Sequence, residues 1–170
     1  MKQVMMSLLL TTALFLTGCG MQSIPTQKNE VDATLAEVTN QYKRRMDLVP
    51  NLVNDVQGYA KHEKETLTGV VEARAKATQM TIDPSKATPE QLLKYQQAQG
   101  QLSSALGKLM MITENYPQLK ADAGFRDLQA HLEGTENRIT VARNRYIESI
   151  KGFNNLVTVP PTSWTNSILY

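Results

Sequence analysis

The chain has 170 residues, of which 41% are hydrophobic, and its 18 basic and 16 acidic side chains give a net charge of +2. This length allows one domain, and the near-neutral charge disfavours a protein that binds nucleic acid by electrostatic attraction. The single cysteine, Cys19, excludes a disulfide framework and a cysteine-based zinc site.

Residues 1–18 have the organisation of a secretory signal peptide. Lys2 supplies a positive charge, residues 4–16 form an apolar run, and small residues follow at Gly18 and Gly20. The apolar run is shorter than the about 20 residues that a transmembrane helix needs. We therefore expect the segment to be removed rather than kept as an anchor.

The segment Leu16-Thr17-Gly18-Cys19 resembles the lipobox of bacterial lipoproteins. The resemblance implies cleavage before Cys19 and acyl chains, such as palmitate, on this residue. The alternative is a free cysteine in an ordinary signal peptide. Two or more acyl chains anchor a protein stably, so we expect attachment on the periplasmic or extracellular side of the membrane, with residues 19–30 as lipidated N-terminus and tether. Gly20 favours the outer membrane if the cell is Gram-negative.

Apolar residues from Val31 onward recur every three or four positions, which predicts amphipathic helices. The first helix is predicted over about residues 31–80, with a kink at Pro50 because proline lacks an N–H and clashes with the preceding turn. Pro89 follows a threonine at a helix start, which predicts a second helix over about residues 89–114. A short helical turn is predicted at residues 117–121.

The most regular pattern lies near the C-terminus. From Phe125 to Phe153 the apolar positions step by three and four residues, close to the 3.5-residue average of helices that pack along one another. Pro160 and Pro161 end this helix, and residues 158–170 form a predicted tail. No segment alternates like a strand. We therefore predict an all-α domain over residues 31–157, an antiparallel bundle of three long helices plus short helical pieces.

The sequence contains little that indicates catalysis. His62-Glu63 begins like the zinc-protease motif, but Thr66 stands where that motif needs a second histidine. His62 and His131 alone are too few ligands for a metal site. We therefore predict no enzyme, metal, cofactor or small-molecule substrate. A hydrolase that uses His62 and Glu63 remains a remote alternative.

Several stretches resemble the signature of the LemA family: residues 42–53, 59–63, 72–74, 114–120 and 133–139, together with Phe125, Leu128, Ala142, Arg143 and Tyr146. The resemblance extends over about residues 31–156. It implies a long antiparallel helical bundle with an N-terminal membrane anchor in the bacterial envelope, and it carries over no catalytic residue. The usual anchor of the family is an uncleaved helix, so the lipobox is a departure from its pattern.

Polar residues of this signature fall on the first and last predicted helices, where antiparallel packing can pair them. A paired network would fix the register of the helices. The alternative is a partner-binding face around the Pro50 kink. The residues of this candidate network are Arg45, Asp47, Pro50, Asn51, His62, Glu63, Arg74, Glu133, Glu136, Asn137, Arg138 and Arg143.

These observations favour a lipid-anchored helical protein of the bacterial envelope that acts as a non-enzymatic scaffold or adaptor. Its expected partners are the membrane, through Cys19, and unidentified envelope proteins. The alternative is a membrane-shaping or lipid-interacting protein, in which the basic run Lys43-Arg44-Arg45 touches anionic headgroups.

Overall fold

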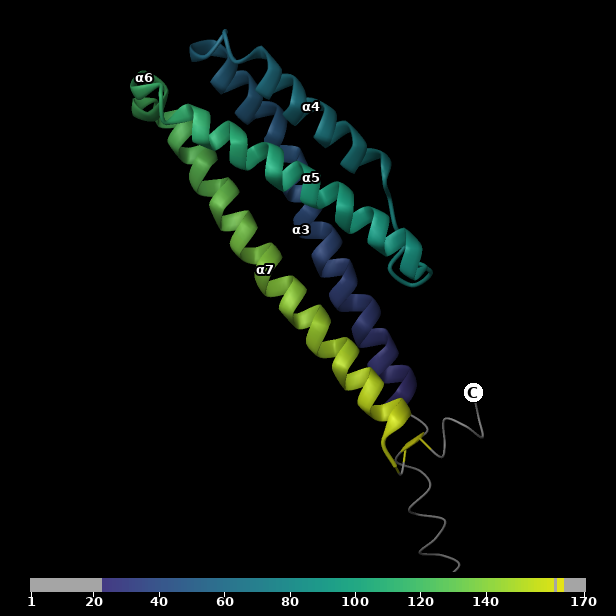
Figure 1. Ribbon diagram of the computed structural model, residues 1–170. Coiled ribbons are helices and arrows are strands. Elements are labelled where there is room, and N and C mark those ends of the chain that lie inside the picture. Colours follow the sequence, from purple (N-terminus) through teal and green to yellow (C-terminus); the bar gives the residue numbers. More distant parts are fainter. Residues whose placement is uncertain (1–22, 161, 164–170) are drawn as a thin grey trace, which may run out of the picture. The chain divides into compact units, whose positions relative to one another are not determined.

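The computed structural model describes residues 23–160 and 162–163. Within these residues there are helices and no strand, which confirms the predicted all-α class. The helices are α3 (Ser23–Tyr59), α4 (Lys64–Gln79), α5 (Pro89–Thr113), α6 (Pro117–Ala121) and α7 (Ala123–Thr158) (Figure 1). The described residues divide into two compact units: the first comprises residues 23–35, 143–160 and 162–163, and the second comprises residues 36–142.

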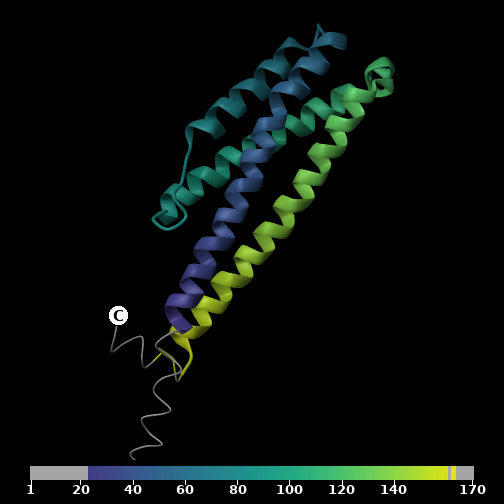
Figure 2. The same ribbon diagram turned by 180° about the vertical axis from the view of Figure 1, so that it is seen from behind.

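In the first unit, the start of α3 lies antiparallel to the end of α7 (Figures 1 and 2). Buried hydroxyl groups of Thr34 and Ser149 are 2.8 Å apart, and Gln27 donates a hydrogen bond to the Ser149 carbonyl at 3.4 Å. Residues 23–30, which belong to the predicted tether of residues 19–30, are helical and include the buried Ile24. The reason is that Ile24 finds apolar burial, which stabilises this extra helical length. Cys19 lies outside the described residues.

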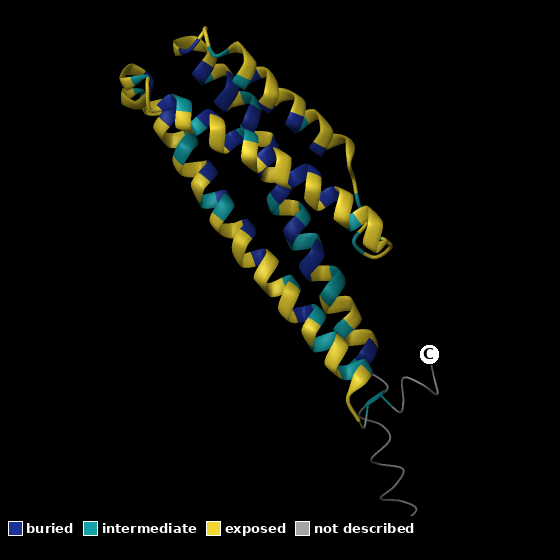
Figure 3. Cartoon of the chain, in the orientation of Figure 1, coloured by how far each residue is buried: buried dark blue, intermediate teal, exposed yellow. Residues whose placement is uncertain are grey.

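The second unit contains the rest of α3 and α7 together with α4, α5 and α6. Its core draws apolar side chains from all five helices, and they form the inward-facing rows of buried residues in Figure 3. Leu52, Val56, Val70, Leu102 and Leu109 are among the most deeply buried of these residues. This unit holds the side chains that carry the candidate site.

The predicted continuous helix over residues 31–80 is wrong. α3 continues through Pro50 and ends at Tyr59, and after residues 60–63 the chain turns back as α4. Ala60 is fully buried in this turn, and the Glu63 N–H donates to its carbonyl at 3.1 Å. Among the described residues, α3, α5 and α7 are the three long helices, with 37, 25 and 36 residues, and α4 and α6 are shorter, so the predicted bundle class holds. The break lies about ten residues beyond the predicted kink.

The later boundaries agree closely with the sequence. The Thr88 hydroxyl accepts a hydrogen bond from the Gln91 N–H, and the Gln91 side chain accepts one from the Thr88 N–H, which forms a capping box before Pro89. α5 and α6 span the predicted residues, and α7 extends to Thr158, five residues beyond Phe153. Within the predicted tail, residues 161 and 164–170 lie outside the described residues.

Asp122 caps the N-terminus of α7. Its carboxylate accepts hydrogen bonds from the Phe125 N–H at 2.9 Å and from the Tyr59 hydroxyl at 3.2 Å. The hydrogen bond from the Phe125 N–H is the main reason why the pKa of Asp122 lies below its ordinary value, and Tyr59 contributes further. Conversely, the charge of Asp122 raises the pKa of Tyr59.

The cap predicts a specific dependence of stability on pH. Because the folded-state pKa of Asp122 is lowered, its contribution to the free energy of unfolding is present above the unfolded pKa and is lost as the pH falls through the folded pKa. We expect Asp122→Ala to be less stable than the wild type at pH 7 and the difference to shrink toward pH 2, as measured by urea unfolding.

Asp122→Asn is the matched control, since asparagine caps a helix about as well but does not titrate. This variant should stay close to the wild type at pH 7 and lose less stability in acid. If the stability curves of the wild type and Asp122→Ala ran parallel from pH 7 to pH 2, the capping charge would have no role in stability.

Candidate functional site

The central polar feature of the second unit is the buried guanidinium of Arg45 on α3. Arg45 is only 2% exposed. One Nη atom donates to the two carboxylate oxygens of Glu136 on α7, at 2.9 and 3.3 Å. The other donates to the backbone carbonyl of Gln99 on α5 at 2.9 Å and to its side-chain oxygen at 2.7 Å. A single side chain therefore connects three helices.

Aromatic rings cover the buried charge. The Arg45 guanidinium lies 5.1 Å from the centre of the Tyr42 ring, in a cation–π contact. The Tyr42 and Tyr95 rings meet edge to face at 5.7 Å. Burial is the main reason why the pKa of Tyr95 rises to about 12, so its hydroxyl stays protonated at neutral pH. Arg45 Nε is buried and has no hydrogen-bond partner among the described residues, which adds to the cost of the buried charge.

A second polar contact joins α3 to α4. The side chain of Arg74 on α4 donates from Nε to the Met46 carbonyl at 2.8 Å. In a regular helix, this carbonyl would accept the N–H of the residue four positions later, which is Pro50 and has none. Pro50 therefore leaves an acceptor inside the α3 helix, and Arg74 satisfies it from the neighbouring helix.

This arrangement predicts an energetic coupling between Pro50 and Arg74. Arg74→Leu should lower the free energy of unfolding by about 1–3 kcal/mol, because the Met46 carbonyl loses its partner. In a Pro50→Ala background the restored N–H can bond this carbonyl, so the same change should cost about 1 kcal/mol less. A double-mutant cycle measured by urea unfolding tests this, and strict additivity would contradict it.

One further contact involves the turns at the ends of the helices. Glu63, which precedes α4, accepts a hydrogen bond from the Tyr116 hydroxyl at 3.0 Å, and this bond is the main cause of a raised pKa at Tyr116. His62 is exposed. In the described part of the chain, no group of three or more histidine, cysteine, aspartate or glutamate residues is placed to hold a metal ion.

The structure brings together only part of the predicted network. It joins Arg45 to Glu136, Arg74 to the carbonyl freed by Pro50, and Glu63 to a tyrosine. Among the described residues, the other members are exposed and bind no side chain of another helix: Asp47, Asn51, His62, Glu133, Asn137, Arg138 and Arg143. The predicted basic run also loses a member, because Arg45 lies in the interior.

Sequence analysis did not identify Gln99, Tyr42 or Tyr95 as part of this site. A signal exists in their spacing. Tyr42 and Arg45 continue the three- and four-residue steps of the buried α3 stripe, and Tyr95 and Gln99 do the same on α5. When each of two facing helices has a polar residue at a core position, as with Arg45 on α3 and Gln99 on α5, the pattern indicates a buried polar contact.

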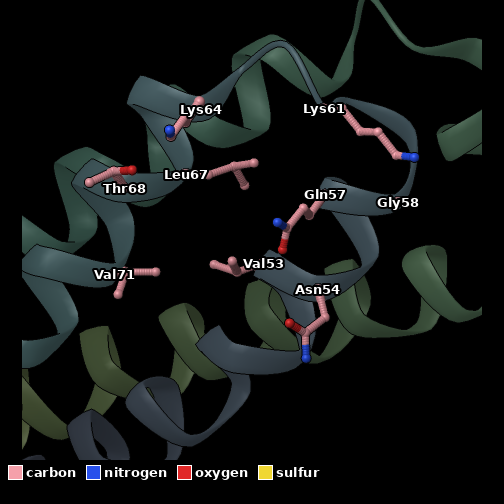
Figure 4. Close-up of a pocket in the computed structure, with 9 residues that line it drawn as sticks. All are labelled: Val53, Asn54, Gln57, Gly58, Lys61, Lys64, Leu67, Thr68 and Val71. Atoms are coloured by element: carbon pink, nitrogen blue, oxygen red, sulfur yellow. The ribbon is translucent and has the colours of Figure 1, made fainter.

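An open groove lies between the end of α3 and the start of α4, with a volume of about 760 Å³. Figure 4 shows Val53, Leu67 and Val71 directed toward the space between the two helices. Lys61 and Lys64 lie at its edge, and no carboxylate is among its lining residues. Val71 is 51% exposed, so this apolar surface is accessible.

The fold and the site define a class of protein: a helical bundle stabilised by a buried arginine, with open grooves between its helices. The chain matches the family model described as "LemA family" over residues 34–170, and it belongs to the LemA family. It is also similar to "Protein LemA" of Metamycoplasma hominis, with 26% identity over 141 residues that cover 83% of this chain and 59% of the relative. Thus the chain spans less than two thirds of that relative.

None of the helices in residues 23–160 is long and apolar enough to cross a membrane. The proposed signal peptide and Cys19 lie outside the described residues. Members of the LemA family are not known as enzymes.

Proposed function

We propose that this LemA family protein is a lipid-anchored, non-enzymatic adaptor of the bacterial envelope. Its anchor is acylated Cys19, and its helical second unit binds a segment of another envelope protein. The observation that carries the proposal is the groove between α3 and α4, in which Val71 stays accessible beside two lysines while Val53 and Leu67 are almost fully buried.

The chemistry of this groove favours one kind of partner segment. Val53, Leu67 and Val71 offer apolar contact, and Lys61 and Lys64 offer positive charge without a carboxylate in the lining. An apolar segment that carries acidic residues complements both properties. The buried Arg45 contacts serve a different purpose in this proposal, since they hold together the helices that form the groove.

A photo-crosslinking residue in place of Val71 tests the adaptor function in intact cells. We expect one discrete protein adduct from this position, because it lies in the groove. The matched control is Val141, which is 50% exposed on α7 and outside the groove. Charge reversal by Lys61→Glu together with Lys64→Glu should reduce the adduct. Identical adducts from both positions, or none from Val71, would sink the proposal.

The anchor has a separate test. Cys19→Ser should abolish acylation and release the protein from membranes, or leave its precursor uncleaved. The intact mass and the membrane fraction are measured together. An unchanged mass with full membrane retention would refute lipidation at this residue.

The membrane-shaping alternative loses part of its basis in the structure. It relied on three consecutive basic side chains, but Arg45 is buried and bound to Glu136. Lys43 and Arg44 alone are fewer charges than a polybasic patch has. For the hydrolase alternative, Glu63 is engaged by the Tyr116 hydroxyl rather than by His62.

A further inference from the structure

Helix α4 is packed more weakly than its neighbour α5. It lies beside α3 and α5 (Figures 1 and 2), and its buried side chains are Leu67, Val70, Ala73 and Ala77. Two of these four are alanines, and each alanine methyl group removes little apolar area from water. By contrast, α5 buries three leucines and a tyrosine besides Ala98. The apolar burial that holds α4 in place is therefore small.

Open grooves run along two sides of α4. The groove between α3 and α4 is lined by Thr68 and Val71 of this helix. A second groove, with a volume of about 1390 Å³, lies between α4 and α5, and Gly69, Glu72 and Lys76 are in its lining. Water therefore reaches α4 from both sides. Access of water and few apolar contacts are the features of segments that open locally while the rest of a protein stays folded.

Few polar contacts connect α4 to its neighbours. Among the described residues, its side chains make two hydrogen bonds with other helices, both to Met46: Arg74 Nε donates to the carbonyl at 2.8 Å, and the Thr78 hydroxyl donates to the sulfur, a weak acceptor, at 3.6 Å. None of the ion pairs between described residues involves α4. Glu63 at its N-terminus provides no side-chain cap and accepts from Tyr116 instead.

The length and composition of α4 decide what happens when it detaches. Its 16 residues are close to the shortest length at which an isolated helix forms in water. Gly69 and five β-branched residues lower its helix propensity further. Residues 60–63 and 80–88 connect it to α3 and α5, and none of residues 80–88 is buried. Once detached, α4 therefore unfolds between two connections that need not break other contacts of the core.

We propose that α4 is a lid: it detaches from α3 and α5 and unfolds as one unit, while those two helices stay folded. Opening removes Lys64, Leu67 and Val71 from the groove between α3 and α4. A segment bound in that groove contacts both helices, so it holds the lid shut. This consequence rests on the proposed adaptor function, whereas the opening itself rests only on the packing of α4.

Hydrogen exchange of the full chain, without any partner, tests the opening. Peptides from α4 and from α5 are compared by mass spectrometry, and each rate is divided by the intrinsic rate of its sequence. We expect the amides of α4 to exchange at least about tenfold faster than those of α5, because α5 exchanges only when the second unit unfolds.

Two glycines provide matched variants. An alanine Cβ at Gly69 on α4, or at Gly100 on α5, has no heavy atom within 4 Å among the described residues beyond the local backbone of its own helix. Each substitution should therefore stabilise its helix without a clash and slow exchange by about two- to fivefold where that helix must unfold. Gly69→Ala should slow exchange in both helices, since α4 is unfolded in the open lid and in the unfolded state. Gly100→Ala should slow α5 and leave α4 unchanged.

Three outcomes would overturn the lid. Equal protection of α4 and α5, or equal slowing of α4 by the two variants, would mean that α4 opens only with the rest of the second unit. If Gly69→Ala did not slow α4, this helix would exchange without unfolding as one unit. Circular dichroism checks that both variants keep their helix content. Because no partner is present, failure of the lid is distinguishable from failure of the adaptor function.

Discussion

Replacing Arg45 with alanine should lower the free energy of unfolding by about 3–5 kcal/mol. The change removes four hydrogen bonds, the cation–π contact with Tyr42 and a large buried side chain. It also leaves the Gln99 side-chain oxygen without its donor in a buried position. Urea unfolding followed by circular dichroism measures the loss.

Further variants, measured in the same way, separate the contribution of the Arg45 charge to stability from the contribution of its side-chain volume. Glu136→Gln leaves the guanidinium buried without its counter-ion, and it should cost about 1–3 kcal/mol because the Glu136 side chain is still 40% exposed and partly hydrated. Arg45→Met combined with Glu136→Gln should cost less than the sum of the single changes. Arg44→Ala on the exposed side of α3 is the control, with an effect within about 0.5 kcal/mol. Equal losses from Arg44→Ala and Arg45→Ala would contradict the structural role.

Phe125→Ala is the other substitution with a large expected effect, also about 3–5 kcal/mol. Phe125 is fully buried at the start of α7, in the same core cluster as Leu119 of α6. Truncation removes apolar contact and leaves a cavity in the core. Thermal and urea unfolding should report the same loss.

Met111→Ala is the control for Phe125→Ala, since Met111 is 71% exposed on α5. Its effect should stay within about 0.5 kcal/mol. A loss below 1 kcal/mol for Phe125→Ala would mean that the start of α7 is not packed into the core as described.

Much of the fold could be predicted because the sequence signals for helix ends and the spacing of apolar residues agree with the helices and the buried positions of the structure. The capping residues before Pro89 and the regular spacing after Phe125 identify α5 and α7 closely. The turn at residues 60–63 was missed for a physical reason. Successive core residues Val53, Val56, Ala60 and Leu67 lie three, four and seven residues apart, so the apolar period continues across the turn while both helices face the same core.

The site was harder to predict than the fold. Arg45 follows two exposed basic residues, so its neighbours in sequence indicate a solvated turn, although its spacing from Tyr42 and Val49 places it on the buried stripe. The partner of Arg74 is a backbone carbonyl, which no pattern of side chains indicates. Pairing of Arg45 with Gln99 depends on the α3–α5 contact, and this follows only once α4 turns back.

The free carbonyl at Met46 also limits how α4 can dock. Other carbonyls in the interior of α3 are occupied by their own helix, so Arg74 has one acceptor within this stretch of backbone. A slip of α4 by one residue would move Arg74 about 1.5 Å along its axis and turn it by about 100°. Pro50 thus determines the register of α4. It removes one hydrogen bond within α3, and the acceptor left by that loss fixes the position at which the neighbouring helix packs.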